Sequence, residues 1–155
     1  MSKIINMSKP MIIKEEVLFK ATMEQVWELI INPEMTKQYM FGCEVLSDWK
    51  VGSPVYWKGK TEDNKEVVYV KGEVLEYQEG IKVTTTTFDP NSGMKDIPNN
   101  YVNLTYQLEK VEEGTLLTII QGDFAGAEEG KKRYEESKGG WKEMVIPIMK
   151  KLLME

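Results

Sequence analysis

The chain has 155 residues, a net charge of −5 and an isoelectric point near 5.0, which fits a single domain with a substantial core. Hydrophobic residues make up 41% and charged residues 29%, the balance of a folded globular domain and not of a disordered segment. An acidic chain whose one arginine is Arg133 offers little to a phosphate backbone, so we exclude nucleic-acid binding.

The first third of the chain predicts one strand and two short helices. Alternating side chains over residues 11–20 indicate the strand. Thr22 is then placed to cap a helix over residues 23–31, with Gln25 closing a capping box. Asn32 and Pro33 predict a second helix, because asparagine caps and proline fits the first helical position. This helix should end near residues 39–42.

The next eighty residues are strand-like and broken by turn residues. Short separators require hairpins, so we predict an antiparallel meander over residues 44–49, 54–60, 67–77, 81–88, 101–110 and 115–124. In the strand at 67–77, alternation places Val68, Val70 and Val74 on one face and Tyr69 and Tyr77 on the other. The long separator at residues 89–100 is typical of a lid or binding loop.

A cover for the apolar face of this sheet is predicted at the end of the chain. Residues 127–155 are helix-like, with an interruption at Gly139-Gly140 and a bend at Pro147. The helical stripe that should face the sheet consists of Trp141, Met144, Val145, Ile148 and Leu152.

No apolar run is long enough to cross a membrane, and residues 1–10 lack the core of a secretory leader. We therefore expect a cytoplasmic protein with a flexible N-terminus at residues 1–10 and a single domain at residues 11–155.

The residue types that carry most chemistry at neutral pH are missing. The chain has no histidine, and Cys43 is its one cysteine. A serine–histidine triad, a cysteine–histidine pair and a thiolate cluster for zinc are therefore impossible. We name no catalytic residue, no metal ligand and no cofactor.

Several motifs resemble those of a known superfamily. Residues 19–27 are similar to its opening strand and A-x-x-x-x-V-W helix start, and Asn32-Pro33-Glu34 with residues 39–42 is similar to D-P-E…W-F-G. Further likenesses lie at residues 51–57, 71–76, 114–121 and 139–141. Together they resemble the START-like, birch-pollen-allergen-like (SRPBCC) superfamily. Its most similar branch is homologous to the C-terminal domain of the activator of the 90-kDa heat-shock chaperone ATPase. Two positions depart from the pattern: Gln121 replaces a histidine, and Tyr39-Met40 replaces a tryptophan.

The resemblance implies an α+β helix-grip fold, in which a curved antiparallel sheet of about seven strands wraps around a long C-terminal helix. It also implies a cavity between the two, holding a small hydrophobic ligand such as a lipid, polyketide or aromatic metabolite. Tyr39 and Phe41 are candidates to close its mouth. The other candidate lining residues are Trp57, Val70, Val74, Phe88, Leu104, Tyr106, Ile119, Gln121, Trp141, Val145 and Met149. The alternative is that the aliphatic ones fill an ordinary core.

Three polar positions bear on the choice between functions. Tyr106 and Gln121 would need partners if buried, and a ligand is one such partner. Glu15 shares the alternation of Ile13 and Val17, which places a carboxylate toward the core unless the register is reversed or a lysine pairs with it. The resemblance favours non-catalytic binding. An acid–base enzyme of cyclase or dehydratase type using Glu15 or Tyr106, and a chaperone-partner protein, are the alternatives.

Overall fold

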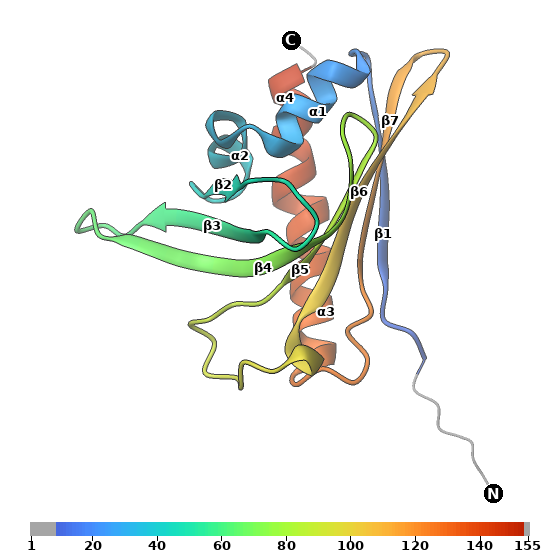
Figure 1. Cartoon of the computed structure of the whole chain (residues 1–155). Coiled ribbons are helices and arrows are strands. Elements are labelled where there is room, and N and C mark those ends of the chain that lie inside the picture. The colour runs from blue at the N-terminus through green and yellow to red at the C-terminus, as the bar shows by residue number, and fades with distance from the viewer. Residues whose placement is uncertain (1–8, 154–155) are drawn as a thin grey trace, which may run out of the picture.

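The computed structural model describes residues 9–153, and in it a seven-stranded sheet curves around the C-terminal helix (Figure 1). The strand order is β1-β7-β6-β5-β4-β3-β2, and every neighbouring pair is antiparallel. The α+β helix-grip prediction is confirmed. The flexible N-terminus predicted at residues 1–10 lies outside the described residues except for Lys9 and Pro10.

The N-terminal elements form where the local signals place them. Strand β1 (Ile13–Phe19) leads into helix α1 (Met23–Ile31), whose capping box between Thr22 and Gln25 is complete. Helix α2 (Pro33–Tyr39) begins immediately afterwards, with the Asn32 side chain accepting from the Glu34 amide at 2.9 Å. Each cap satisfies amides that a helix start leaves unpaired. The caps therefore stabilise two short helices between the first two strands.

Six strands follow in a meander, near the predicted boundaries. They are β2 (Glu44–Ser47), β3 (Pro54–Lys60), β4 (Glu66–Gln78), β5 (Lys82–Thr87), β6 (Val102–Val111) and β7 (Gly114–Gly122). A short 3₁₀ helix, η2 (Pro98–Asn100), precedes β6. In Figure 1 the long hairpin of β3 and β4 extends away from the body of the molecule.

The predicted alternation along β4 is wrong at two points, because the strand contains two bulges. Trp57 pairs with Val70 and Lys58 with Val68, which leaves Tyr69 as an extra residue. Leu75 is extra in the same way opposite β5. Each extra residue reverses which face the following side chains occupy. Tyr69 and Tyr77 therefore lie on the concave face with Val70, whereas Val68 lies on the convex face.

The C-terminal helix is also not interrupted where we expected. Helix α3 (Gly130–Gly140) continues through both glycines into a π-helical turn, η3 (Trp141–Val145), and then into α4 (Ile146–Leu153). In the π turn the Ile146 amide bonds the carbonyl of Trp141, five residues back. This widened turn precedes Pro147, which has no amide to donate and would crowd the carbonyl four residues back in a regular α-helix.

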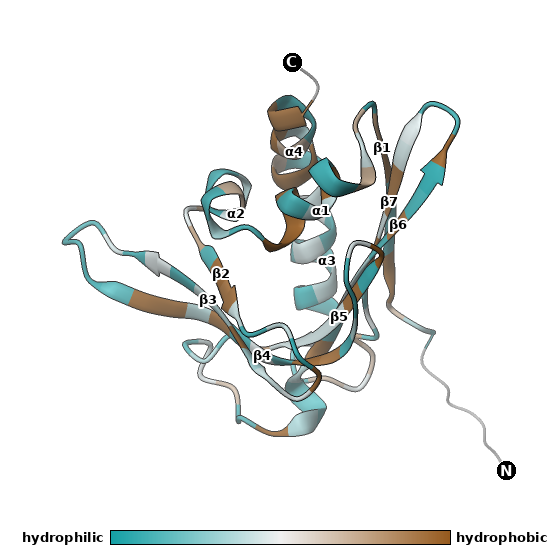
Figure 2. Ribbon diagram, turned by 45° about the horizontal axis from the view of Figure 1, so that its top comes forward, coloured by the Kyte–Doolittle hydropathy of each residue, from teal (hydrophilic) through white to brown (hydrophobic). Residues whose placement is uncertain are grey.

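The buried stripe of the C-terminal helix therefore differs from the predicted one. Trp141, Val145 and Met149 are buried, whereas Met144 and Ile148 are 51% and 39% exposed. Figure 2 shows α4 carrying more hydrophobic residues than α3. Helix α4 packs on β1, α1 and α2, and the large core fills the space between these elements and the concave face of the sheet. Within residues 9–153, no helix is long and apolar enough to cross a membrane.

Candidate functional site: a cavity under the helix

A cavity of about 680 Å³ lies between the curved sheet and the C-terminal helix. Its sheet wall comes from β3 to β7 and the residues that follow β5 and β7, and its helix wall comes from α3 and η3. The remaining side is formed by the segment that joins α2 to β2. The lining residues are Met40, Phe41, Cys43, Trp57, Tyr69, Val70, Thr87, Phe88, Asp89, Val102, Leu104, Gln121, Phe124, Arg133, Glu136, Ser137, Gly140, Trp141 and Val145.

The sequence of α3 explains why this space is not filled by core side chains. Arg133, Glu136, Ser137 and Gly140 recur at helical spacing and therefore share one face of α3, the face over the cavity. None of these is a large apolar side chain, and a methyl group added at Gly140 would meet nothing within 4 Å. Filling this space as a packed core would need large apolar side chains at these positions, and the sequence has none there.

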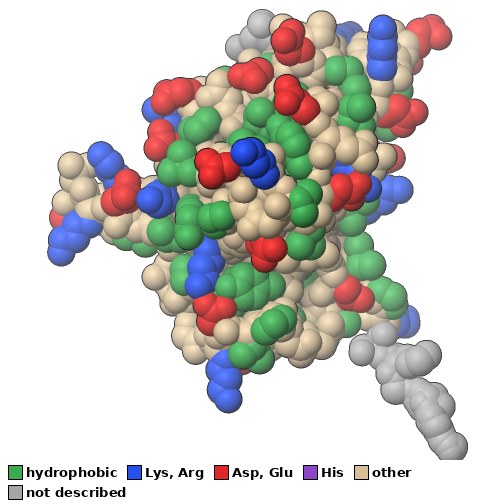
Figure 3. All heavy atoms as spheres, in the orientation of Figure 1, with side chains coloured by type: hydrophobic (Ala, Val, Ile, Leu, Met, Phe, Trp, Pro, Cys, Tyr) green, Lys and Arg blue, Asp and Glu red, His purple; other side chains and the backbone are tan. Residues whose placement is uncertain are grey.

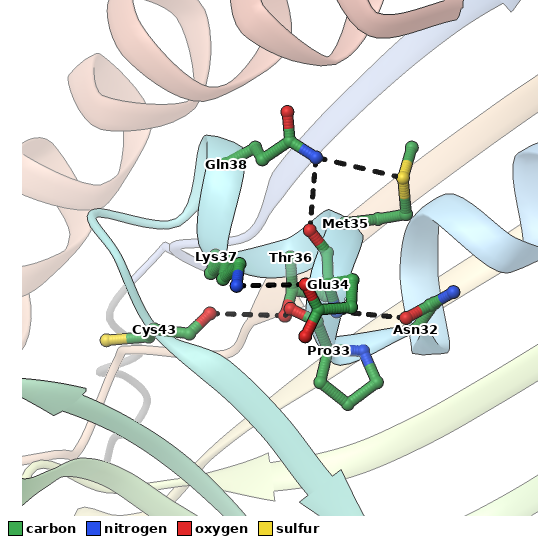
Figure 4. Close-up of polar contacts among 8 residues, drawn as sticks. All are labelled: Asn32, Pro33, Glu34, Met35, Thr36, Lys37, Gln38 and Cys43. Atoms are coloured by element: carbon green, nitrogen blue, oxygen red, sulfur yellow. Dashed lines mark hydrogen bonds and ion pairs between the residues drawn. The ribbon is translucent and has the colours of Figure 1, made fainter.

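One rim of the cavity is fixed by a buried threonine. Thr36 of α2 is fully buried, and its hydroxyl donates to the carbonyl of Cys43 and accepts from the amide of Val45, both at 3.1 Å. Figure 4 shows Thr36 and Cys43 joined across the chain that connects α2 to β2. This bridge holds the segment that carries Phe41, whose backbone is left-handed (φ 54°) and whose side chain is 65% exposed.

We expect Thr36→Val to lower the free energy of unfolding by about 1–3 kcal/mol, because it leaves a buried carbonyl and a buried amide without their shared partner. Urea denaturation measures this change. Thr118→Val is the matched control, since Thr118 lies on the outer face opposite Glu16 and Gln107, and it should change stability by less than about 0.5 kcal/mol. Equal effects of the two substitutions would contradict the role given to Thr36.

Polar groups in the cavity wall are held by specific bonds. The indole Nε1 of Trp141 donates to the side-chain oxygen of Gln121 at 2.8 Å. Arg133 donates to the backbone carbonyls of Asn100 and Glu128, at 3.0 and 3.4 Å. Burial lowers the pKa of the Arg133 guanidinium, while the charges of Asp89 and Glu128 act in the opposite direction. The wall is thus mostly apolar, with a few positioned polar groups, as is usual for small-molecule sites.

The long loop predicted as a lid borders this cavity through Asp89. Two contacts attach it to β4: the Asn91 side chain donates to the Val68 carbonyl at 2.8 Å, and Asp96 pairs with Lys71. Asp96 also accepts from the Tyr101 hydroxyl at 2.6 Å, and together these two partners lower the pKa of its carboxyl group, with Lys71 contributing most. A role of the loop as a lid stays a prediction.

The structure places eight of the fourteen candidate site residues in the wall of the cavity. They are Phe41, Trp57, Val70, Phe88, Leu104, Gln121, Trp141 and Val145. The other six lie outside its lining: Glu15, Tyr39, Val74, Tyr106, Ile119 and Met149. Of these, Val74, Ile119 and Met149 are fully buried and pack in the core, which is the alternative that was stated for the aliphatic candidates.

The three polar residues of this second group have different surroundings. Tyr39 is buried and donates its hydroxyl to the Leu29 carbonyl at 2.8 Å, so it joins α1 to α2 and does not close the mouth. Glu15 is half-buried on the inner face of β1 opposite Ile119. The Tyr106 hydroxyl is buried without a hydrogen-bond partner among the described residues, beside a second, much smaller hollow. Burial strongly raises the pKa of Tyr106, which keeps its phenol neutral.

Sequence reasoning found the η3 part of the helix wall but missed the α3 part and part of the rim. The helical spacing of Arg133, Glu136, Ser137 and Gly140 was available in the sequence, but the paired glycines were interpreted as a break. Tyr69 reaches the cavity only because of its bulge, which no sequence pattern indicates. Within residues 9–153, no group of three or more acidic or cysteine side chains is placed to hold a metal ion.

Cys43 provides a chemical probe of this site. It is the one cysteine of the chain, it is 6% exposed, and it lines the cavity. Burial raises the pKa of its thiol, so at a given pH less of it is thiolate than in an exposed cysteine. We expect alkylation by iodoacetamide, followed by mass spectrometry, to be slow at pH 7–8 and to keep rising above pH 9. A rate equal to that of free cysteine would contradict the buried placement.

Comparison with known proteins identifies the relationship that the fold suggests. A family model described as "Activator of Hsp90 ATPase homolog 1-like protein" matches residues 20–154. The chain belongs to this family. The resemblance predicted from the motifs is therefore confirmed. No curated protein matches the chain.

Solved structures of relatives share the fold over nearly the whole chain. The solution structure of a protein from Cytophaga hutchinsonii is 32% identical, with 96% of this chain and 97% of that one covered and a TM-score of 0.75. An Hsp90 activator from Plasmodium falciparum is 17% identical over 92% of this chain and 94% of that one, with a TM-score of 0.65. DynU16, a protein in the dynemicin biosynthetic locus, is 15% identical over 92% of this chain and 47% of that one, with a TM-score of 0.69. The last two likenesses concern the fold alone.

Proposed function

We propose that this family member binds a small hydrophobic molecule, of the lipid, polyketide or aromatic class, in the cavity under the helix without transforming it. The observation that carries the proposal is the cavity itself. Its volume of about 680 Å³ lies within the range of small-molecule sites, roughly 300–1,000 Å³. Aromatic side chains contribute much of its lining, including Phe41, Trp57, Phe88, Phe124 and Trp141.

The shape of the site supports an organic guest more than an ion. Phe41 has a left-handed backbone, is largely exposed and lines the cavity, which supports a role in covering a bound molecule. Polar side chains such as Asp89, Arg133 and Glu136 bring both signs of charge to the wall. An amphipathic molecule could bury its apolar part against the aromatic rings and direct polar atoms to these groups. The proposal includes a cytoplasmic location, as expected from the sequence.

A thermal-shift screen tests the proposal. The purified protein is heated with fatty acids, sterols, flavonoids and polyketide-like aromatics, each over a concentration series that reaches about one hundred times the dissociation constant of a tight binder. Binding to the native state at that ratio adds about 2.7 kcal/mol of stability, which for a domain of this size should raise Tm by roughly 5–10 °C. Cooperative melting with no shift for any chemical class would count against the proposal.

Two other functions, an acid–base enzyme and a chaperone-partner protein, have to be distinguished from ligand binding. An acid–base enzyme would need Glu15 or Tyr106 at the substrate, and neither lines the cavity. A chaperone-partner role is favoured by the family match and by Met144 and Ile148, which leave an apolar stripe exposed on the C-terminal helix. Stimulation of the ATPase of a purified 90-kDa heat-shock chaperone, lost in the double variant Met144→Glu and Ile148→Glu, would support that second role.

A further inference from the structure

Gln121 occupies a position on the cavity wall where the direction of its amide group is determined. It lies on the inner face of β7 with Leu104 as its partner in β6, and both residues line the cavity. The Trp141 indole donates to the Gln121 side-chain oxygen at 2.8 Å. An indole N–H can only donate. The oxygen end of the amide must therefore face Trp141, and the opposite orientation would place two donors against each other.

This orientation leaves the other end of the amide free. The Gln121 NH₂ group carries two N–H donors, and the structure gives it no acceptor among the described residues. Leu104 is the strand partner of Gln121, and Val102 and Phe124 also line the cavity. Trp141 itself is buried and held edge-on by Tyr106, with ring centroids 6.2 Å apart. Packing therefore fixes the Trp141 indole, and the indole in turn fixes the orientation of the Gln121 amide.

From this geometry we infer that Gln121 selects ligands that present a hydrogen-bond acceptor, such as a ketone or quinone oxygen, to this wall. The inference rests on the proposed function and specifies its ligand class. A ligand oxygen at this position accepts from the free amide N–H. A hydrocarbon leaves that donor unpaired, and a ligand N–H meets another donor, which is worse because both groups lose their water without compensation.

Three probes with one tricyclic frame test the inference. Fluorene has no polar atom, 9-fluorenone presents a single acceptor oxygen, and carbazole presents a single N–H donor. Their dissociation constants are measured at pH 8 by calorimetry, with protein titrated into dilute probe. We expect 9-fluorenone to bind about fivefold more tightly than fluorene, the ratio that corresponds to one neutral hydrogen bond, and carbazole to bind no more tightly than fluorene.

Two substitutions of Gln121 should change the relative affinities of the three probes: one should reverse the preference and the other should abolish it. In its carboxylate form, Gln121→Glu keeps an oxygen for Trp141 and turns the free end into an acceptor, so carbazole should now bind more tightly than 9-fluorenone. Gln121→Met removes the polar end, and the 9-fluorenone to fluorene ratio should fall to about one. Gln107→Glu, the same charge change on the exposed face of β6, should leave the order of the parent unchanged.

The possible failures are distinguishable. If fluorene binds and 9-fluorenone binds no more tightly, the selection by Gln121 is wrong while the hydrophobic site stands. The same conclusion follows if the preference for 9-fluorenone survives Gln121→Met. If none of the three probes binds to the folded protein, the inference fails, and the proposed function fails with it when the thermal-shift screen also shows no shift for any chemical class.

Discussion

Replacing Gly140 by phenylalanine should weaken binding of a cavity-filling hydrophobic ligand at least tenfold while the protein remains folded. Gly140 lies in the helix wall of the cavity, and a side chain attached there would meet no neighbouring atom within 4 Å. The new ring would therefore project into the space that a ligand needs. Because glycine is the weakest ordinary helix former, the substitution should not lower Tm and should raise it slightly.

Gly139→Phe is the matched control for this experiment. Gly139 precedes Gly140 in the same helix and also has open space around an added side chain, but it does not line the cavity. Both variants should melt at or above the temperature of the parent, and calorimetry with the tightest binder of the screen should show loss of affinity only for Gly140→Phe. Equal binding by the two variants would mean that the ligand occupies some other site.

Gly72→Ala should lower the free energy of unfolding strongly, because the added methyl group has no room. An added Cβ at Gly72 would lie 1.7 Å from the backbone oxygen of Thr86, and a carbonyl of a neighbouring strand cannot turn aside as a flexible side chain can. We expect a loss of at least about 3 kcal/mol in the free energy of unfolding. The close approach also positions Phe88, which bonds to Lys71 through both backbone groups at 2.8 Å and lines the cavity.

Urea denaturation followed by circular dichroism measures this loss. Gly139→Ala is the control, because its Cβ meets nothing and its backbone is already helical, and it should be neutral or stabilising by up to about 1 kcal/mol. A variant Gly72→Ala that does not fold agrees with the expectation. One that unfolds within 0.5 kcal/mol of the parent would show that β4 and β5 can separate freely at this point.

Local signals in the sequence were sufficient for most of the fold. The caps at Thr22 and Asn32 and the turns between strands act over a few residues, so their chemistry can be recognised without knowing the tertiary structure. The bulge at Tyr69 and the π turn before Pro147 could not be predicted in this way. Each inserts one residue into a regular pattern, and which residue becomes the extra one depends on neighbours that are distant in sequence.

Site residues whose position depends on a local sequence pattern could be predicted, whereas those that depend on distant parts of the chain could not. Leu104 lies on the strand face that alternation selected, whereas Gln121 was a candidate because of the family resemblance. Alternation selects the inner face but does not separate a cavity wall from a packed core, which is why Ile119 was included. That distinction depends on what the opposite element supplies, here the small and polar face of α3.

The outer surface carries charges of both signs beside exposed hydrophobic residues. In the face that Figure 3 shows, basic and acidic residues are interspersed with hydrophobic side chains. In the turn between β3 and β4, Asp63 pairs with Lys65 at 4.0 Å. Exposed ion pairs of this kind contribute little to stability.

The placement of the tryptophans gives the protein a built-in optical reporter. Of the four in the chain, Trp57 and Trp141 line the cavity, whereas Trp27 and Trp49 pack around Tyr77 outside its lining. A ligand in the cavity can change the emission of Trp57 and Trp141 by direct contact, because both residues line it. Occupancy can therefore be followed by ultraviolet fluorescence without any label, and single Trp→Phe changes at 57 and 141 would tell which of the two tryptophans reports it.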